Sequence, residues 1–238
     1  MMERSMSVMF PRGGRPSRWP GPANGGAGSL RLLPLLPCFL ASLLLLAQDT
    51  GEARDAWQRP AEVIEALAVE PGSAVADVGC GEGYFSFHLE RRVGAKGHVY
   101  AVDIDEEVLG KLRAEAKKQQ LAQIEIIAGT EDDPRLPAGN LDAVLIVNAY
   151  HEMRRYDAML EAIHLALKPG GRLGIIDAAA EAGQERSSYF DRHRVPKEVV
   201  QQEVGRRGFR FAGERPGFTR PRDHREFWFL VFDKPASK

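Results

Sequence analysis

The sequence has few cysteines and no surplus of basic charge. Its 238 residues include only two cysteines, Cys38 and Cys80, and neither has another ligand at the spacing of a metal site. The six histidines form no HExxH or related cluster, so we expect no metal ion. Lys and Arg number 32 against 33 acids, and this net charge of -1 argues against general binding of nucleic acid. A small-molecule substrate is the expected partner, and the oligomeric state is left open.

The first 53 residues differ in composition from the rest. Residues 1–29 are rich in Arg, Gly, Pro and Ser and lack an apolar period, which is typical of a disordered region. Residues 30–53 hold an apolar run, preceded by arginines and followed by small residues, so they are predicted to be a secretory signal or membrane anchor. We expect export or membrane association through residues 30–47, or a cytoplasmic location if this extension is not a functional signal. The folded domain is then expected at residues 54–238.

From residue 54 onward, short apolar segments alternate with amphipathic ones. Helical spacing predicts helices at 57–68, 84–92, 106–120, 156–167 and 196–207, and apolar runs predict strands at 74–78, 98–103, 124–127, 141–147 and 172–177. Such alternation is typical of a doubly wound, Rossmann-like α/β fold with a mostly parallel sheet. Two more strands, 209–213 and 226–232, have no helix between them. They predict an antiparallel C-terminal hairpin at the edge of a seven-stranded sheet.

A glycine-rich loop follows the first predicted strand and opens a helix. It reads Asp77-Val78-Gly79-Cys80-Gly81-Glu82-Gly83-Tyr84. Glycine permits positive φ angles and close approach of a ligand, and the start of a helix offers free N–H groups. Dinucleotide sites place the third glycine three residues after the second, whereas here it comes two residues after it. This spacing disfavours a nicotinamide-dependent oxidoreductase.

Read as (D/E)xGxGxG, this loop resembles motif I of the class I S-adenosylmethionine-dependent methyltransferases. Asp103, at the end of the second predicted strand, matches the family's acid that binds the ribose hydroxyls, while Asp105 is expected to cap the next helix. The resemblance spans about Trp57 to Lys234. It implies S-adenosylmethionine as the cofactor and methyl transfer to a small-molecule acceptor. It also implies a set of cofactor-binding residues: Asp77, Gly79, Cys80, Gly81, Gly83, Tyr84, Asp103, Ile104, Asp132 and Asn148.

Two loops depart from the family pattern. After the third strand, Asp132 is favoured for the family's adenine contact, with Thr130 and Glu131 as alternatives, and Asp133 is expected to cap the turn before Pro134. After the fourth strand the sequence Asn-Ala-Tyr-His-Glu at 148–152 lacks the two prolines of the nucleic-acid amino-methyltransferases. This difference argues against methylation of a base.

The candidate catalytic residues are His151, Tyr150 and Asp177. His151 is favoured as general base because imidazole titrates near neutral pH, but a buried structural histidine is an equal alternative. Tyr150 and His151 are expected at the mouth of the pocket, and Asp177 ends the fifth strand. In the insertion 178–195, Tyr189 and Phe190 are lid or core residues, and Trp57 is a second candidate to cover the cofactor. The alternative function is a non-catalytic module that binds S-adenosylmethionine.

Overall fold

The computed structural model describes residues 51–220 and 223–236. The predicted disordered region 1–29 and almost all of the predicted signal or anchor segment 30–53 lie outside these residues. Among the described residues, no helix has the length and apolar character needed to cross a bilayer. The first described helix, α2 (Glu52–Gln58), begins two residues before the predicted start of the domain.

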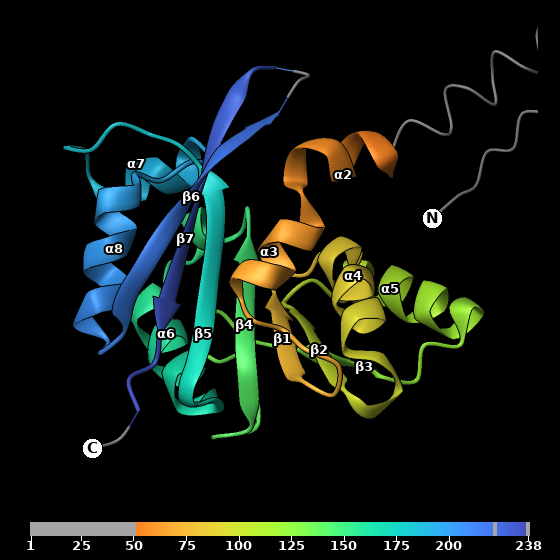
Figure 1. Cartoon of the computed structure of the whole chain (residues 1–238). Helices are drawn as coiled ribbons and strands as arrows, with labels where there is room; N and C mark the ends of the chain where they lie inside the picture. Colours follow the sequence, from red (N-terminus) through yellow and green to blue (C-terminus); the bar gives the residue numbers. More distant parts are fainter. Residues whose placement is uncertain (1–50, 221–222, 237–238) are drawn as a thin grey trace, which may run out of the picture. The chain divides into compact units, whose positions relative to one another are not determined.

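A seven-stranded sheet forms the centre of the domain, in the order β3-β2-β1-β4-β5-β7-β6 (Figure 1). Strands β1 to β5 are parallel, whereas β7 is antiparallel to both β5 and β6. This arrangement confirms the predicted fold class and the antiparallel C-terminal pair. The strands are β1 (Ala74–Val78), β2 (His98–Asp103), β3 (Ile124–Ala128), β4 (Leu141–Val147), β5 (Leu167–Ala178), β6 (Arg210–Arg220) and β7 (Arg225–Asp233).

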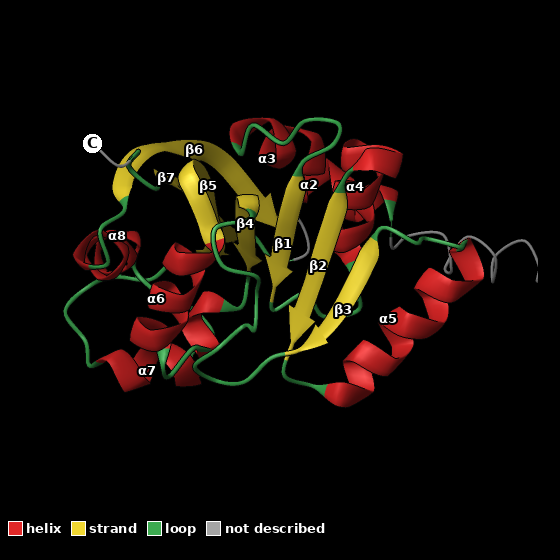
Figure 2. Cartoon of the chain, turned by 90° about the horizontal axis from the view of Figure 1, so that it is seen from below, coloured by secondary structure: helices red, strands yellow, loops and turns green. Residues whose placement is uncertain are grey.

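Helices cover both faces of the sheet (Figure 2). Because successive strand residues point to opposite faces, Val75 packs with the residues of α3 and α4, whereas Ala76 packs with those of α6 and α8. Helix α5 packs over Ala101 on the first of these faces. The remaining helices are α3 (Pro60–Ala66), α4 (Tyr84–Val93), η1 (Gly94–Lys96), α5 (Glu106–Gln119), η2 (Tyr150–Glu152), α6 (Tyr156–Ala166), α7 (Arg186–Asp191) and α8 (Lys197–Arg206).

The predicted helix over residues 57–68 is wrong in one respect, because the structure has two helices there. Arg59 takes a left-handed conformation, with φ 49°, and separates α2 from α3. Pro60 explains the break, since proline lacks an N–H donor and disfavours helical backbone in the residue before it. Pro60 is then well placed as the first residue of α3. The break leaves α2 as a separate helix beside the glycine loop.

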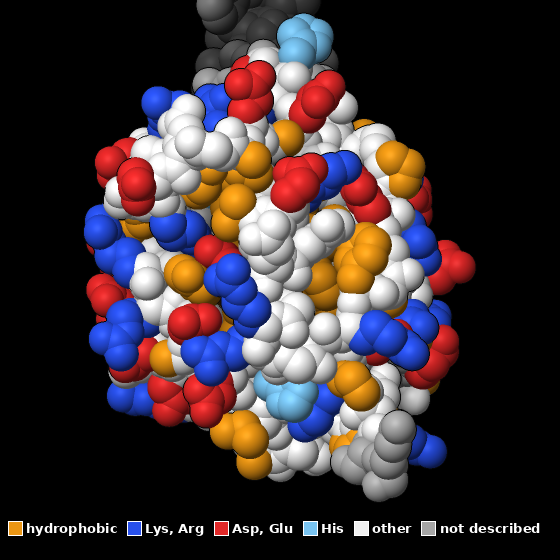
Figure 3. Space-filling model, turned by 90° about the vertical axis from the view of Figure 1, so that its left-hand side faces the viewer, with side chains coloured by type: hydrophobic (Ala, Val, Ile, Leu, Met, Phe, Trp, Pro, Cys, Tyr) orange, Lys and Arg blue, Asp and Glu red, His pale blue; other side chains and the backbone are white. Residues whose placement is uncertain are grey.

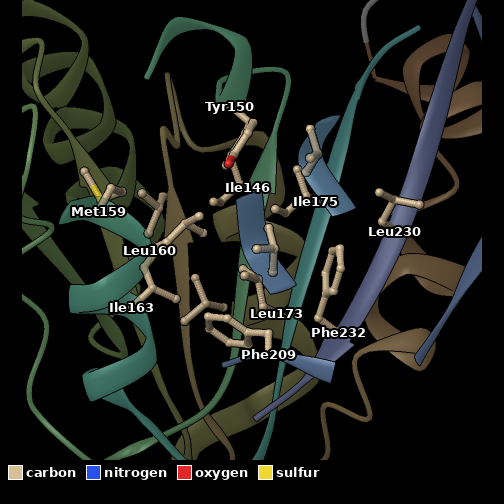
Figure 4. Packing of buried hydrophobic residues seen from close by; sticks show 14 of the residues in the cluster. Ile146, Tyr150, Met159, Leu160, Ile163, Leu173, Ile175, Phe209, Leu230 and Phe232 are labelled. Carbon is tan, nitrogen blue, oxygen red and sulfur yellow. The ribbon is translucent and has the colours of Figure 1, made fainter. Parts of the chain in front are cut away.

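The main core lies between the sheet and helices α6 and α8 (Figure 4). It includes Tyr150 and Trp228, both almost without exposed surface. On the side of the molecule shown in Figure 3, basic and acidic side chains are interspersed rather than gathered into one large patch of a single sign.

Candidate active site

The glycine loop lies at the carboxyl ends of β1 and β2. Its three glycines are needed for different structural reasons. Gly79, Gly81 and Gly83 all have positive φ, at 74°, 56° and 88°. A Cβ on Gly79 would lie 2.5 Å from the Cβ of Ala149, and one on Gly83 would lie 2.3 Å from the buried Leu112 side chain. A Cβ on Gly81 would meet nothing within 4 Å. Gly79 and Gly83 are therefore required by packing, whereas Gly81 borders open space.

Asp103 fixes this loop from the end of β2. One oxygen of its carboxylate accepts a hydrogen bond from the Gly81 N–H at 2.9 Å, and the other accepts one from the Ile104 N–H at 2.8 Å. The next acid, Asp105, caps α5 by accepting from the N–H groups of Glu107 and Val108, as predicted. Asp103 and Asp105 therefore have separate tasks, and only Asp103 faces the glycine loop.

A first cavity of about 460 Å³ opens between the glycine loop, the end of β2 and the segment after β4. Ile104, which is 60% exposed despite its apolar side chain, gives it a flat apolar wall. Its other lining residues are Val78, Gly79, Gly81, Val102, Asp103, Thr130, Glu131, Asn148, Ala149, Glu152, Met153, Arg154, Met159 and Phe190. It thus combines an acid, an apolar wall and the open side of the glycine loop.

Asp132, the favoured adenine ligand, does not line the first cavity. Its carboxylate accepts a hydrogen bond from the Thr130 hydroxyl at 2.8 Å, and it borders a neighbouring surface hollow instead. The two alternatives, Thr130 and Glu131, do line the first cavity. Asp133 accepts from the Arg135 N–H at 2.7 Å, as expected for a residue that stabilises the turn. The structure therefore moves the candidate adenine contact from Asp132 to its two neighbours.

A second cavity, of about 720 Å³, lies on the other side of the glycine loop, against α2 and α4. Asp77, Cys80, Tyr84 and Asn148 all line it, and Asn148 also lines the first cavity. Asp77 is only 2% exposed, and burial raises its pKa to about 6 even though the Ser86 hydroxyl donates to it at 2.7 Å. A buried carboxylate of this kind would favour a positively charged ligand group.

Helix α2 closes one side of the second cavity. The Tyr84 hydroxyl donates to Asp55, and the guanidinium of Arg54 lies 3.8 Å from the centre of the Tyr84 ring. Trp57 also lines this cavity and packs against Phe227. The predicted covering role of Trp57 therefore agrees with its position. Burial raises the pKa of the Cys80 thiol, so Cys80 acts as a small apolar residue rather than a nucleophile.

His151 and Asp177 form a buried pair at the ends of β4 and β5. The Nδ1 atom of His151 lies 2.8 Å from one Asp177 oxygen, and its backbone N–H donates to the other at 2.9 Å. Both side chains are almost completely buried, at 1% and 0% exposed. Burial disfavours protonation of the ring, but the hydrogen bond and charge of Asp177, aided by Glu152, outweigh it and raise the pKa of His151. The ring is thus held in one orientation.

Tyr150 does not stand at the mouth of the pocket, so this expectation is wrong. Its side chain points into the core beside Ile146 and Ile175 (Figure 4), and its hydroxyl donates to the buried Glu203 carboxylate at 2.8 Å. Arg186 pairs with the other oxygen of Glu203 at 3.0 Å. Burial and the charge of Glu203 raise the pKa of Tyr150 well above its ordinary value, which keeps the phenol protonated. These contacts give Tyr150 a structural position rather than a catalytic one.

A third cavity, of about 190 Å³, adjoins the first and is lined by His151, Met153, Arg154, Arg186, Ser187 and Phe190. Met153, Arg154 and Phe190 line both cavities, so the two are neighbours. The guanidinium of Arg154 stacks over the Phe190 ring at 3.9 Å. Tyr189 belongs to the core, whereas Phe190 faces the cavities, which separates the two predicted roles of the insertion.

The sequence analysis did not single out several of the lining residues. Met153 and Arg154 come directly after η2 in the segment that follows β4, and this place in the chain is their one signal. Arg186 and Ser187 lie at the start of α7, a short helix that the sequence pattern does not reveal. Glu152 also lines the first cavity, although the sequence indicates no site role for it.

Comparison with known proteins gives this geometry a family. The sequence profile of a methyltransferase domain family matches residues 75–171, which include the glycine loop, Asp103 and the segment after β4. This match, together with the fold and the glycine loop, supports a class I S-adenosylmethionine-dependent methyltransferase. S-adenosylmethionine is the cofactor of this family, and the first and second cavities lie where the loop and Asp103 would hold it.

Curated methyltransferases are similar to part of this chain. A demethylmenaquinone methyltransferase of Listeria welshimeri is 30% identical over 123 residues, which are 52% of this chain and 51% of that protein. Nocamycin O-methyltransferase of Saccharothrix syringae is 31% identical over 113 residues, or 48% of this chain and 40% of that protein. The methyltransferase chain thus spans about half or less of these relatives' length.

Solved structures share the methyltransferase fold at lower identity. A S-adenosylmethionine-dependent methyltransferase from Aquifex aeolicus superimposes with a TM-score of 0.66 and 23% identity, covering 81% of this chain and 97% of the other. The [4+2]-cyclase SpnF superimposes with a TM-score of 0.67 and 18% identity, covering 76% and 82% of the two chains. At these identities the likeness concerns the fold.

Proposed function

We propose that this protein transfers the methyl group of S-adenosylmethionine to a small-molecule acceptor. The observation that carries the proposal is the position of Asp103, whose carboxylate faces the glycine loop at the edge of the first cavity. A carboxylate there can accept hydrogen bonds from both ribose hydroxyls of the cofactor. Ile104 then offers an apolar wall to the adenine, with Thr130 and Glu131 within the same cavity.

The second cavity suits the methionine end of the cofactor. Asp77 and the open side of the glycine loop line it, together with Asn148, which borders both cavities. The negative charge of Asp77 favours the cofactor's ammonium group, and Arg54 and Arg220 provide positive charge for its carboxylate. The methyl group would then lie near Asn148, where the first and second cavities meet.

Methyl transfer is an in-line displacement at a carbon that the sulfonium already activates. A lone pair of the acceptor forms the new bond to the methyl carbon, the carbon–sulfur bond breaks, and its electron pair stays on sulfur as S-adenosylhomocysteine. The protein aligns the two reactants, excludes water and, for an O–H or N–H acceptor, receives the proton. His151 is our candidate for the group that accepts this proton. Asp177 orients its ring, and it borders the third cavity.

A small acceptor is supported by the size of the third cavity, about 190 Å³, and by its walls. Phe190 and Met153 would contact an apolar or aromatic ring, and Arg154 would contact an anionic substituent. The names of the relatives, a demethylmenaquinone methyltransferase and a nocamycin O-methyltransferase, are consistent with a small-molecule acceptor of the same general kind.

The alternative is a module that binds S-adenosylmethionine without methyl transfer. The fold also occurs in the [4+2]-cyclase SpnF, so the fold alone does not establish methyl transfer. The buried His151–Asp177 pair beside the third cavity favours an enzyme, because a binding module has no need of an oriented imidazole next to the cofactor.

Calorimetric titration with S-adenosylmethionine and S-adenosylhomocysteine tests the proposed cofactor site. Asp103→Ala should weaken binding by about 2–4 kcal/mol, because it removes two charge-assisted hydrogen bonds. Asp105→Ala is the matched control, since it removes a neighbouring carboxylate that only caps α5. Equal affinity in wild type and Asp103→Ala would contradict the site.

Incubation of metabolite extracts with labelled S-adenosylmethionine, followed by mass spectrometry, tests methyl transfer itself. A labelled product that forms with the wild type and not with Asp103→Ala supports an enzyme. Cofactor binding without any labelled product supports the binding module.

We also propose that residues 30–47 direct export or membrane association. The support is the apolar run after an arginine-containing segment. N-terminal sequencing of the native protein and cell fractionation test this proposal. An intact N-terminus on protein recovered from the cytosol would contradict it.

A further inference from the structure

The free nitrogen of His151 is unusual for a buried polar atom. The side chain is 1% exposed, and Nδ1 is bonded to Asp177, but among residues 51–220 and 223–236 Nε2 has no hydrogen-bond partner. Buried polar groups are normally paired, so each unpaired one needs an explanation. When Nδ1–H donates to a carboxylate, the lone pair of the neutral ring lies on Nε2, which is the arrangement found in metal-ligating histidines.

Two other potential ligands stand beside Nε2. The Oε1 atom of Glu152 lies 3.4 Å from it, and Nδ1 of His193 lies 3.5 Å from the same oxygen. The three ligand atoms all lie within 4.8 Å of one another. A tetrahedral ion with bonds of about 2.0–2.1 Å needs ligand atoms about 3.3–3.4 Å apart. Two separations already match, and the exposed side chains of Glu152 and His193 can rotate to complete the third.

We propose that His151, Glu152 and His193 bind a divalent cation of the first transition row, with Zn²⁺ as the best match. Two imidazoles and one carboxylate form a donor set that suits such ions, and three protein ligands leave a fourth position open. Asp177 is the positioning residue, because it fixes the ring orientation and the tautomer of His151. The sequence expectation of no metal ion rested on short spacings, whereas His193 reaches this site from beyond α7.

Ordinary ion pairing explains these contacts less well. The Nε2 atom of His151 and the Glu152 oxygen lie 3.4 Å apart without a hydrogen bond, so an ion pair would leave Nε2 unsatisfied. A cation between the three groups would satisfy the Nε2 lone pair and the Glu152 carboxylate together, and it would also bind His193.

The location gives the cation a use that rests on the proposed methyl transfer. Glu152 lines the first cavity and His151 lines the third, so the open position of the cation faces the boundary between cofactor and acceptor. An acceptor hydroxyl bound there would lose its proton to water more readily. Its oxygen would then bond to the methyl carbon as the carbon–sulfur bond breaks. With the cation bound, Nε2 is a ligand, and the cation replaces His151 as the group that assists deprotonation.

Direct metal binding tests the site without reference to activity. The full chain, without a polyhistidine tag and after treatment with a chelator, is titrated with Zn²⁺ by calorimetry and with Co²⁺ by visible absorption. We expect one equivalent of Zn²⁺ and the visible bands of four-coordinate Co²⁺. His193→Ala and Glu152→Gln alter exposed side chains and should each weaken Zn²⁺ binding at least about tenfold, and Asp177→Asn about 10–100-fold.

His98→Ala is the matched control. His98 also faces a glutamate, with Nε2 3.0 Å from Glu125, but this surface pair belongs to no three-residue group among the described residues. It should bind Zn²⁺ as the wild type does. Equal affinity in wild type, His193→Ala and Glu152→Gln would overturn the proposal, as would absence of binding to the wild type. S-adenosylmethionine affinity, measured in parallel on His193→Ala, should stay unchanged, so loss of the metal site and loss of the cofactor site remain distinguishable.

Discussion

The cofactor side and the acceptor side of the candidate active site are built by different means. On the cofactor side, residues 77–105 form one strand–loop–helix–strand unit, and much of the surface that faces the ligand is backbone held by Asp103. On the acceptor side, His151 pairs with Asp177 of β5 and shares the lining of the third cavity with Phe190 of α7, so three separate segments contribute side chains. A backbone site depends on local conformation, whereas a side-chain site depends on the packing of distant elements.

The largest expected effect is on the acceptor side. His151→Ala should lower kcat by about 10²–10⁴ while leaving the affinity for S-adenosylmethionine nearly unchanged, because it removes a group that acts only on the acceptor. Its neighbour Tyr150 is the control. Tyr150→Phe breaks a buried hydrogen bond to Glu203 and should cost stability but retain turnover per folded molecule. The measurement is the turnover rate of each variant divided by its folded fraction. Similar losses of this rate in His151→Ala and Tyr150→Phe would contradict the separate roles of the two residues.

The glycines offer a sharper comparison within the cofactor side. Gly83→Ala should destabilise the domain by about 2–4 kcal/mol, since its Cβ would press on buried Leu112 and its φ is positive. Gly81→Ala meets no neighbour, so it should cost only about 1–2 kcal/mol of backbone strain. Its methyl group would border both cofactor cavities and weaken cofactor binding at least about tenfold. Thermal melts and calorimetry separate the two effects, and equal destabilisation by both variants would contradict this account.

The ionisation of Asp77 makes the free energy of unfolding depend on pH. Because burial raises its pKa to about 6 in the folded protein, ionisation favours the unfolded chain. The folded state should therefore lose up to about 3 kcal/mol as pH rises from about 4 to about 6, and no more above that. Ser86, Arg54 and Asp103 also act on this carboxyl group, and all are present in both proteins compared. Asp77→Asn should be more stable than the wild type at pH 8 and similar at pH 4. Denaturant melts at pH 4 and pH 8 measure the stability of both proteins. An equal stability difference between them at the two pH values would exclude Asp77 as the source of the pH dependence.

The smallest effect is expected from the N-terminus. A chain that begins at Gly51 should melt like the full chain, because the described residues from Gly51 onward form one seven-stranded sheet with helices on both faces. A start at Arg54 would remove the first residues of α2, which supplies Asp55 to Tyr84 and Arg54 to the second cavity. It should therefore weaken S-adenosylmethionine binding more than it lowers the melting temperature. Loss of cooperative melting in the chain that begins at Gly51 would show that residues 1–50 support the domain.

The difference between the two sides also explains how far the sequence could predict them. The glycine loop and Asp103 lie within 27 residues of each other, so their spacing alone indicates a cofactor site. Strand bounds were predicted well because buried parallel strands read as continuous apolar runs, as in β1, β2 and β4. Sequence alone favours Asp132, which does not line the first cavity, over Thr130 and Glu131, which do, because three adjacent polar residues in one loop differ only in the direction of their side chains.

On the acceptor side, the position of His151 after the fourth strand can be predicted from the sequence, but its surroundings cannot. Its pairing with Asp177 depends on the adjacency of β4 and β5, and its approach to His193 depends on the turn after α7. Tyr150 was misassigned because one residue of difference in the short η2 helix decides between the core and the cavity. Such choices follow from tertiary packing, which no local spacing records.

The position of β7 has a consequence for the order in which the two sides form. The last strand of the chain lies between β5 and β6, and Trp228 on β7 pairs with Asp177 on β5. A chain emerging from the ribosome has therefore made β1, β2, β4 and the whole glycine loop well before the strand that flanks Asp177. The glycine loop and Asp103 can be assembled while β5 is still an open edge. The second cavity and the acceptor side are completed only when β6 and β7 arrive, so a molecule cut short near its C-terminus would keep the glycine loop but lack Phe227 and the strand that flanks Asp177.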